Sequence, residues 1–399
     1  MLEADVEVDR RDLTVRARLT VAPGERLALF GPSGAGKTTL LEVIAGLVAP
    51  RRARITLASR VLTSTGQSVT ALPPWQRRVG LLRQDPGLFP HLSVRDNLLY
   101  ARSRSSGRAG PHGSDGSSAP AVPAGSSASA GSSASAEAEL AELAGLLGID
   151  GLLSAMPARL SGGQAHRVAL GRLLLSHCDA LLLDEPYTGL DVSLRRTLTD
   201  LVVSLVTQRR IPAILVAHEL AEAQAFADRL AVLDRGQVLQ TGAPGEVVLR
   251  PAARRVAELV GYTAFVPVRE SAPAAVAQSP TPGSGSGSAG VVAGIHPDRV
   301  ISGRHPARGL VLAGVVGSCR PAGALWEVTI RTADATVTGR LLEAASAGQE
   351  LVLTAVDPPC FAAGGAAVGA RAVPAGEGRP AGGVRAAGGA RPGRAGVQK

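Results

Sequence analysis

The sequence predicts a parallel α/β domain followed by a small all-β domain. A short apolar run over residues 26–30 leads through a glycine-rich loop into an apolar helical pattern over residues 38–47, which is how parallel α/β domains begin. Residues 326–331 alternate apolar and polar side chains, which indicates a half-buried strand. The 399 residues, 45% of them hydrophobic, suffice for two to three domains and exclude a fibrous or wholly disordered protein.

Composition narrows the class of protein further. Of the net charge of +9, residues 361–399 contribute +5 (six basic residues and one acid), so the basic character is largely a property of the tail. Aromatic residues make up only 3% of the chain, which argues against stacking on bases, and no nucleic-acid partner is expected. No apolar run approaches the roughly 20 residues of a membrane-spanning helix. Three widely spaced cysteines and a charged start without an apolar leader fit a reducing, cytosolic compartment.

The first predicted strands of the chain are followed by a motif that binds anions. Alternation over residues 13–21 predicts an edge strand of a hairpin, and residues 26–30 predict a buried strand. The next eight residues match G-x-x-x-x-G-K-[ST] between a predicted strand and a predicted helix. Such glycines let backbone N–H groups surround phosphates at a helix N-terminus. The predicted nucleotide-binding residues are Gly31, Pro32, Ser33, Gly34, Ala35, Gly36, Lys37, Thr38 and Thr39.

Within this motif Lys37 would reach the β- and γ-phosphates, and the hydroxyl of Thr38 would bind Mg²⁺. Only two of the 42 basic residues are lysines, Lys37 and Lys399. In a chain that otherwise uses arginine, an internal lysine indicates a position where an ammonium group is needed. A glycine-rich turn without a ligand is the alternative interpretation.

Two further segments carry weaker signals. Residues 180–184 predict a buried strand that ends in Asp184, followed by Glu185. At a sheet edge Asp184 would hold Mg²⁺ and Glu185 would polarise the attacking water, although acids at strand ends are often only solvated. Leu160-Ser161-Gly162-Gly163-Gln164 precedes a helical pattern, and by itself it could be an ordinary N-cap.

Together these motifs resemble the ATP-binding subunit of ATP-binding cassette (ABC) transporters over about residues 1–260. The phosphate loop is similar to Walker A, residues 181–185 to Walker B, and residues 160–164 to the family signature. Gln84 matches the Q-loop, residues 188–191 the D-loop, and His218 the switch histidine. One departure is that residues 1–29 contain no aromatic side chain, where many relatives stack adenine.

The resemblance implies a composite ATPase site with ATP and Mg²⁺ as cofactors. Two copies of the chain would form a head-to-tail homodimer, in which each phosphate loop faces the signature of the partner. It implies catalytic roles for Glu185, His218 and Gln84, and a Mg²⁺ site formed by Thr38, Gln84 and Asp184. The remaining residues it places at the nucleotide are Ser161, Gly162, Gly163, Gln164 and Asp191.

The region from Gln84 to Leu99 resembles importers for oxyanions and metals, especially the molybdate type. In this region Ser93 and Asp96 fit a capping box that begins a helix. The resemblance implies that the permease subunits dock on the same region. The resemblance places the chain on the cytoplasmic face of the membrane, with a solute-binding protein as an indirect partner. Sulfate or thiosulfate, ferric iron and polyamine importers remain alternatives, as does a soluble ABC ATPase outside transport.

The expected organisation has four parts. An ABC ATPase domain with a helical subdomain covers residues 1–262, and a low-complexity, disordered insertion at 103–136 interrupts it. A flexible linker is expected over 263–290 and a disordered basic tail over 361–399. Residues 291–360 resemble a TOBE-type, OB-like β-barrel, which could bind the transported oxyanion or act as a dimerisation module.

Overall fold

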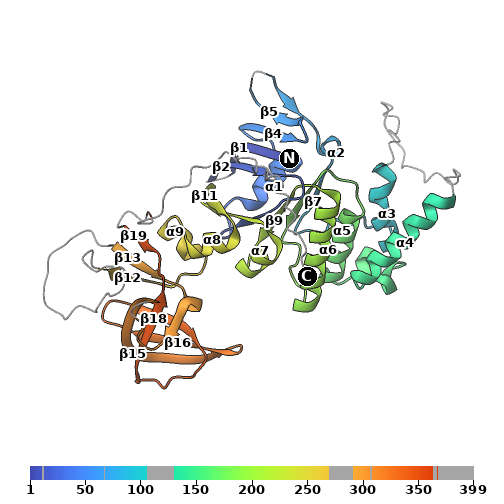
Figure 1. Ribbon diagram of the computed structural model, residues 1–399. Helices are drawn as coiled ribbons and strands as arrows, with labels where there is room; N and C mark the ends of the chain where they lie inside the picture. Colours follow the sequence, from blue (N-terminus) through green and yellow to red (C-terminus); the bar gives the residue numbers. More distant parts are fainter. Residues whose placement is uncertain are drawn as a thin grey trace, which may run out of the picture.

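A computed structural model describes residues 1–10, 13–66, 68–105, 130–268, 291–305, 308–362 and 366. Its α/β domain and smaller C-terminal β domain form two adjoining bodies (Figure 1). In the described ranges the α/β domain is built on one sheet of eleven strands, in the order β6-β5-β4-β1-β2-β11-β10-β3-β9-β8-β7.

One half of this sheet is antiparallel. Its strands are β1 (Leu2–Arg10), β2 (Leu13–Val21), β4 (Arg52–Leu57), β5 (Arg60–Ser64) and β6 (Thr70–Ala71). The alternation of β2 is confirmed, but its predicted place at an edge is wrong, because β2 lies between β1 and β11 (Gln237–Gly242). The half-buried pattern shows that one face of a strand is covered. It does not show which strands pair with its two backbone edges, because that depends on the topology of the sheet.

The other half is parallel and forms the centre of the domain. Its strands are β3 (Arg26–Phe30), β7 (Val79–Leu82), β8 (Ala180–Asp184), β9 (Ala213–Ala217) and β10 (Arg229–Asp234). All residues of β8 and β9 are buried, as expected for strands covered on both faces. Leu182 packs in the cluster that contains helix α1 (Lys37–Ala45), whereas Leu181 and Leu183 pack with the helices of the opposite face.

That opposite face is covered by helices from three parts of the chain. They are α5 (Gly162–Leu174), α6 (Val192–Arg209) and α7 (Leu220–Phe226). Helices α3 (Val94–Ser105) and α4 (Ala130–Leu146), with the 3₁₀ turns Asp150–Leu152 and Pro157–Arg159, make up a helical subdomain beside α5 (Figure 1). The remaining helices are α2 (Pro74–Arg77), α8 (Pro244–Leu249) and α9 (Arg254–Leu259).

The low-complexity insertion differs from expectation at both ends. Residues 103–105 continue α3, and residues 130–136 begin α4. Alanine and serine extend a helix readily once neighbouring turns have formed it, because nucleation is the costly step. The rest of the insertion lies outside the described residues.

The C-terminal domain is all-β, as predicted, apart from one 3₁₀ turn, Pro297–Arg299, in the described part. A three-stranded sheet contains β12 (Ala264–Val268), β13 (Val291–Ile295) and β19 (Cys360–Phe361). A five-stranded antiparallel sheet has the order β14-β18-β15-β16-β17. Its strands are Val300–Ser302 (β14), Gly309–Ala322 (β15), Leu325–Arg331 (β16), Thr336–Leu341 (β17) and Glu350–Val356 (β18).

The C-terminal domain shows that the predicted starts of the linker and of the tail are wrong. The expected linker 263–290 begins too early, because residues 264–268 form β12 and pair with β13. The expected disordered tail 361–399 also begins too early: Phe361 is fully buried and its ring lies 5.9 Å from that of Phe265 in an edge-to-face contact. Both segments pair with β13, which is distant from them in sequence, so no local pattern marks them. Ala366 also forms an isolated β-bridge with Ala253, and its carbonyl oxygen accepts from the N–H of Ala362 at 2.9 Å, so the expected tail is structured there as well. Residues 269–290, 363–365 and 367–399 lie outside the described ranges.

Candidate functional site

The predicted site residues follow four neighbouring parallel strands. The phosphate loop follows β3, His218 follows β9, Glu185 follows β8, and Gln84 comes two residues after β7. These strands are adjacent in the order β3-β9-β8-β7 and run in one direction. Their carboxyl ends therefore meet at one edge of the sheet, where open α/β sheets bind ligands.

The phosphate loop is held by close backbone contacts. A Cβ atom on Gly31 would lie 1.9 Å from the carbonyl oxygen of Leu233, and a Cβ on Gly36 would lie 2.5 Å from Cγ2 of Val15. Gly36 also adopts a φ of 101°, which side-chain-bearing residues rarely adopt, and it is the N-cap of α1. Only glycine fits both positions, so the chain can approach β10 and β2 and begin a helix at the loop.

Lys37 is buried at this edge. Its Nζ donates hydrogen bonds to the carbonyl oxygens of Gly31 (2.8 Å) and Pro32 (2.9 Å). Burial lowers the pKa of the ammonium group, and the carboxylates of Glu185 and Asp184 oppose this shift. Both partners are backbone carbonyls, so the ammonium group can exchange these hydrogen bonds for bonds to an anion in the loop.

Asp184 has the features of a magnesium ligand. Burial raises the pKa of its carboxyl group above the usual range, while a hydrogen bond from the Thr38 side chain lowers it. Its Oδ1 atom is buried and lacks a hydrogen-bond partner among the described residues. Mg²⁺ takes one or two protein oxygens and completes its shell with water and phosphate oxygens. The carboxylate of Asp184 and the hydroxyl of Thr38 fit such a site.

Glu185 and His218 are in direct contact. The Nε2 atom of His218 contacts Oε1 of Glu185. Glu185 has a left-handed φ of 55°, and its N–H group donates to the carbonyl oxygen of Val216 at 3.3 Å. A non-glycine residue in this conformation is uncommon and is often found at functional sites. The strand end thus turns the carboxylate of Glu185 toward the histidine of the neighbouring strand.

Gln84 is exposed beyond the end of β7, whose Leu82 is paired with Leu183 of β8. The residue before it, Arg83, forms an ion pair with Glu42 of α1 (3.4 Å). The sheet therefore places Gln84 at the same edge as Asp184, while the segment around it is tied to the helix that follows the phosphate loop.

Ser161 and Asp191 cap two other helices. The Ser161 hydroxyl accepts from the N–H of Gln164 (3.3 Å), and the Gln164 side chain accepts from the N–H of Ser161 (2.8 Å), which completes a capping box at α5. Asp191 caps α6 by accepting from the N–H of Leu194 (2.9 Å). A Cβ on Gly163 would lie 3.8 Å from the carbonyl oxygen of Gly189, so the two caps are neighbours. Ser161 and Gly162 are exposed, and the predicted N-cap is confirmed.

Two residues that no sequence pattern indicated fix the segment after Gln84. Asn97, fully buried, accepts from the N–H of Phe89 (2.8 Å) and donates to its carbonyl oxygen (3.1 Å). Arg172 of α5 donates to the carbonyl oxygens of Pro86 and Gly87 and stacks on the Phe89 ring at 5.2 Å. A lone asparagine or arginine in a helical pattern gives no signal of such a role. Half of the predicted capping box at Ser93 is confirmed, because its hydroxyl accepts from the N–H of Asp96 (3.1 Å). The Asp96 carboxylate accepts from the Ser93 hydroxyl (2.6 Å).

A parallel sheet with a glycine-rich loop after β3 and an acidic pair at the end of β8 defines a P-loop nucleotide-binding domain. The family model described as ABC transporter matches residues 15–188. Residues 15–188 are therefore similar to the ABC transporter family, as the motifs indicated.

Curated relatives extend this similarity. An iron(III) import ATP-binding protein of Mesorhizobium japonicum is 38% identical over 62% of this chain and 61% of its own length. A molybdenum import ATP-binding protein of Mycobacterium tuberculosis is 38% identical over 64% of this chain and 63% of its own length. Other relatives are named for spermidine/putrescine and sulfate/thiosulfate import. The chain thus matches less than two thirds of the length of these relatives.

A solved structure titled as the ATP-binding subunit of an ABC transporter shares the fold. It has a TM-score of 0.50 and 24% identity, and the match covers 66% of this chain and 95% of that chain. Among the described residues no helix is long and apolar enough to cross a membrane.

Proposed function

We propose that this chain is the ATP-binding and ATP-hydrolysing subunit of an ABC importer. The observation that carries the proposal is the convergence at one sheet edge of the phosphate loop, Asp184, and the Glu185–His218 pair. This edge carries the backbone anion site of the phosphate loop and the buried ammonium group of Lys37. It also carries the unpartnered Oδ1 of Asp184 and the carboxylate of Glu185, which His218 contacts. Those are the parts that phosphoryl transfer to water requires.

In the proposed mechanism the residues 31–39 hold the phosphates of ATP through backbone N–H groups. Lys37 exchanges its bonds to the carbonyls of Gly31 and Pro32 for the β- and γ-phosphate oxygens. Glu185 orients a water molecule and takes its proton as the water oxygen bonds to the γ-phosphorus and the bond to the β–γ bridging oxygen breaks. His218 holds the carboxylate of Glu185 toward this water.

Mg²⁺, when bound, would neutralise charge on the β- and γ-phosphates. Thr38 and Asp184 would hold it directly, and Gln84 is proposed to complete the site. Burial lowers the pKa of the Lys37 ammonium group and raises the pKa of the Asp184 carboxyl group. Bound phosphate and Mg²⁺ would each place an opposite charge beside one of these groups.

A second copy of the chain is proposed to complete each site. Ser161, Gly162, Gly163 and Gln164 begin α5 and Asp191 begins α6, whereas the phosphate loop begins α1. Exposed N–H groups at a helix N-terminus suit a phosphate, and a head-to-tail homodimer would present them to the γ-phosphate of the partner.

Permease subunits are proposed to dock on residues 84–99, on the cytoplasmic face of the membrane, with a solute-binding protein as an indirect partner. Asn97 and Arg172 fix this segment against α5. A rigid segment that starts at Gln84 could pass movement between the nucleotide and a bound permease.

Molybdate is the solute we propose, with the C-terminal β domain as a second oxyanion-binding site. The 38% identity to a molybdenum import protein supports it, and equal identity to an iron import protein makes ferric iron the strongest competitor. The test is cellular molybdenum in a strain that lacks this gene, grown on trace molybdate. Wild type, but not Lys37→Ala, should restore it. Unchanged molybdenum in a strain without a second importer would reject molybdate and direct the assay to iron, sulfate and polyamines.

The ATPase assignment is tested separately by Glu185→Gln. The amide cannot accept the proton of the attacking water, so hydrolysis should be abolished while ATP binding remains and an ATP-bound dimer accumulates. The measurements are phosphate release and molecular mass in solution with ATP. Hydrolysis near the wild-type rate would show that Glu185 is not the base.

A further inference from the structure

We propose that the ion pair between Asp234 and Arg255 positions the phosphate loop and links it to the C-terminal β domain. The proposal rests on the proposed function only in taking the loop as the nucleotide site. Asp234 ends β10, and Arg255 belongs to α9.

The β10–β11 turn lies directly against the phosphate loop. The N–H of Gly236 donates to the carbonyl oxygen of Ala35 at 3.0 Å, and the carbonyl oxygen of Gly236 accepts from the N–H of Arg16 at 2.7 Å. One residue before Asp234, the carbonyl of Leu233 fills the space beside Gly31. The end of β10 therefore touches the loop at its start, and the turn touches it near its end, so a shift of this segment must move the loop.

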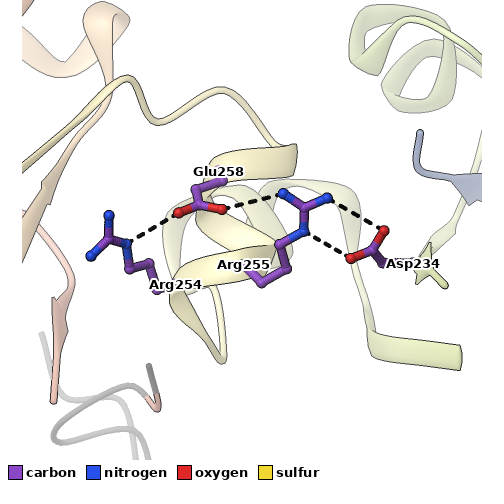
Figure 2. Close-up of polar contacts among 4 residues, drawn as sticks. All are labelled: Asp234, Arg254, Arg255 and Glu258. Atoms are coloured by element: carbon purple, nitrogen blue, oxygen red, sulfur yellow. Dashed lines mark hydrogen bonds and ion pairs between the residues drawn. The ribbon is translucent and has the colours of Figure 1, made fainter. Parts of the chain in front are cut away.

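Arg255 fixes the first residue of this turn (Figure 2). Its Nε donates to Oδ2 of Asp234 at 2.8 Å, and its Nη2 donates to Oδ1 at 3.4 Å. The Asp234 side chain is only 9% exposed, whereas that of Arg255 is 46% exposed. A two-point contact from guanidinium to carboxylate sets orientation as well as charge. Without Arg255 a buried carboxylate would lose its counterion and draw the turn toward water.

The contacts continue into the C-terminal domain. Glu258 accepts from Nη1 of Arg255 (3.3 Å) and from Nε of Arg254 (3.1 Å) (Figure 2). The guanidinium carbon of Arg254 lies 4.4 Å from the ring centroid of Phe265 in β12. Residues of one short helix thus join the end of β10 to the first strand of the β domain.

The experiment uses the full chain and two arginine variants. Arg255→Ala removes the pair, and Arg229→Ala is the matched control. Arg229 lies at the opposite end of β10, is 43% exposed, and forms a 3.0 Å ion pair with Glu25. Affinity is measured for an ATP analogue with a non-hydrolysable β–γ bridge in the presence of Mg²⁺. Hydrogen–deuterium exchange is measured over residues 31–37 without nucleotide, and the melting temperature is recorded for all variants.

Arg255→Ala should raise the Kd of the analogue about fivefold, a coupling typical of neighbouring sites that share backbone contacts. It should also speed exchange over residues 31–37. Arg229→Ala should leave both within about twofold of wild type, even where it lowers the melting temperature equally. Equal Kd and exchange in the two variants would overturn the proposal.

Two further outcomes keep the test decisive. If Arg255→Ala does not fold, Arg255→Gln, which keeps a polar side chain but not the charge, is expected to shift Kd and exchange in the same direction, and unchanged values overturn the proposal. If the wild-type chain binds no nucleotide, the proposed function fails. The exchange comparison, made without nucleotide, then still decides whether the pair positions the loop.

Discussion

Replacement of Arg77 by methionine should destabilise the α/β domain although Arg77 lies outside the predicted site. Arg77 is 4% exposed, and its guanidinium group donates to the carbonyl oxygens of Leu72 (2.7 Å), Ile44 (2.9 Å) and Val43 (3.1 Å). It also donates to the hydroxyl of Thr63 (2.9 Å). The side chain thus joins the C-terminus of α1, the helix that begins at the phosphate loop, to the antiparallel half of the sheet.

The size of the effect follows from the acceptors left behind. Val43 keeps another donor, the N–H of Gly46 at 3.1 Å, so the main losses fall on the carbonyls of Ile44 and Leu72. A buried polar group left without its partner costs about 1–3 kcal/mol, which gives a total of about 2–6 kcal/mol. Methionine fills similar volume and also removes the desolvation cost of the guanidinium, so we expect about 3 kcal/mol.

The assay is urea unfolding of the full chain, followed by far-ultraviolet circular dichroism. Arg78→Met is the matched control, because Arg78 is the next residue but its side chain is 55% exposed and pairs with Asp179 at the surface. Surface pairs contribute about 0–1 kcal/mol. If Arg77→Met lowers the free energy of unfolding by no more than Arg78→Met does, the buried guanidinium does not stabilise the domain and the reasoning is refuted.

Three other predictions address the site and the domain boundaries. Asp184→Asn should raise the melting temperature at about pH 7 without Mg²⁺ and ATP, because burial raises the folded-state pKa of Asp184 and its ionised form therefore destabilises the fold. This gain in melting temperature should vanish as the pH falls through the folded-state pKa. A lower melting temperature of the variant at about pH 7 would contradict the prediction. Phe361→Ala should cost about 3–5 kcal/mol in urea unfolding, and a loss below about 1 kcal/mol would mean that the residue is part of the tail after all. Deletion of residues 106–129, a low-complexity stretch, should leave ATP turnover within about twofold of wild type, and a collapse in turnover would make the insertion regulatory.

The chemistry of the site could be predicted from sequence because its parts are local. The phosphate loop, the acidic pair and the two helix caps each consist of residues within a few positions of one another. Their conformations depend on glycine, on strand ends and on short side chains that bond nearby N–H groups. The parallel order of the central strands follows from the strand–helix alternation, so convergence at one edge could be expected as well.

The domain boundaries could not be predicted in the same way. Residues 264–268 and Phe361 are strands only because β13 supplies their hydrogen-bond partners. Proline- and alanine-rich flanks resemble a linker until that partner is known. The helical ends of the insertion were missed for a similar reason, since small residues adopt whatever conformation their neighbours impose.

The groups that can act on a phosphate can be identified from local motifs: an ammonium, two carboxylates, a histidine and glycine-rich backbone. How those groups are held depends on the three-dimensional fold. Arg77, Asn97, Arg172 and the Asp234–Arg255 pair each join segments that are far apart along the chain or belong to different elements. A long polar side chain shows in sequence only that it can form hydrogen bonds. Which backbone carbonyl or carboxylate it meets depends on chain segments brought together by burial of the apolar core.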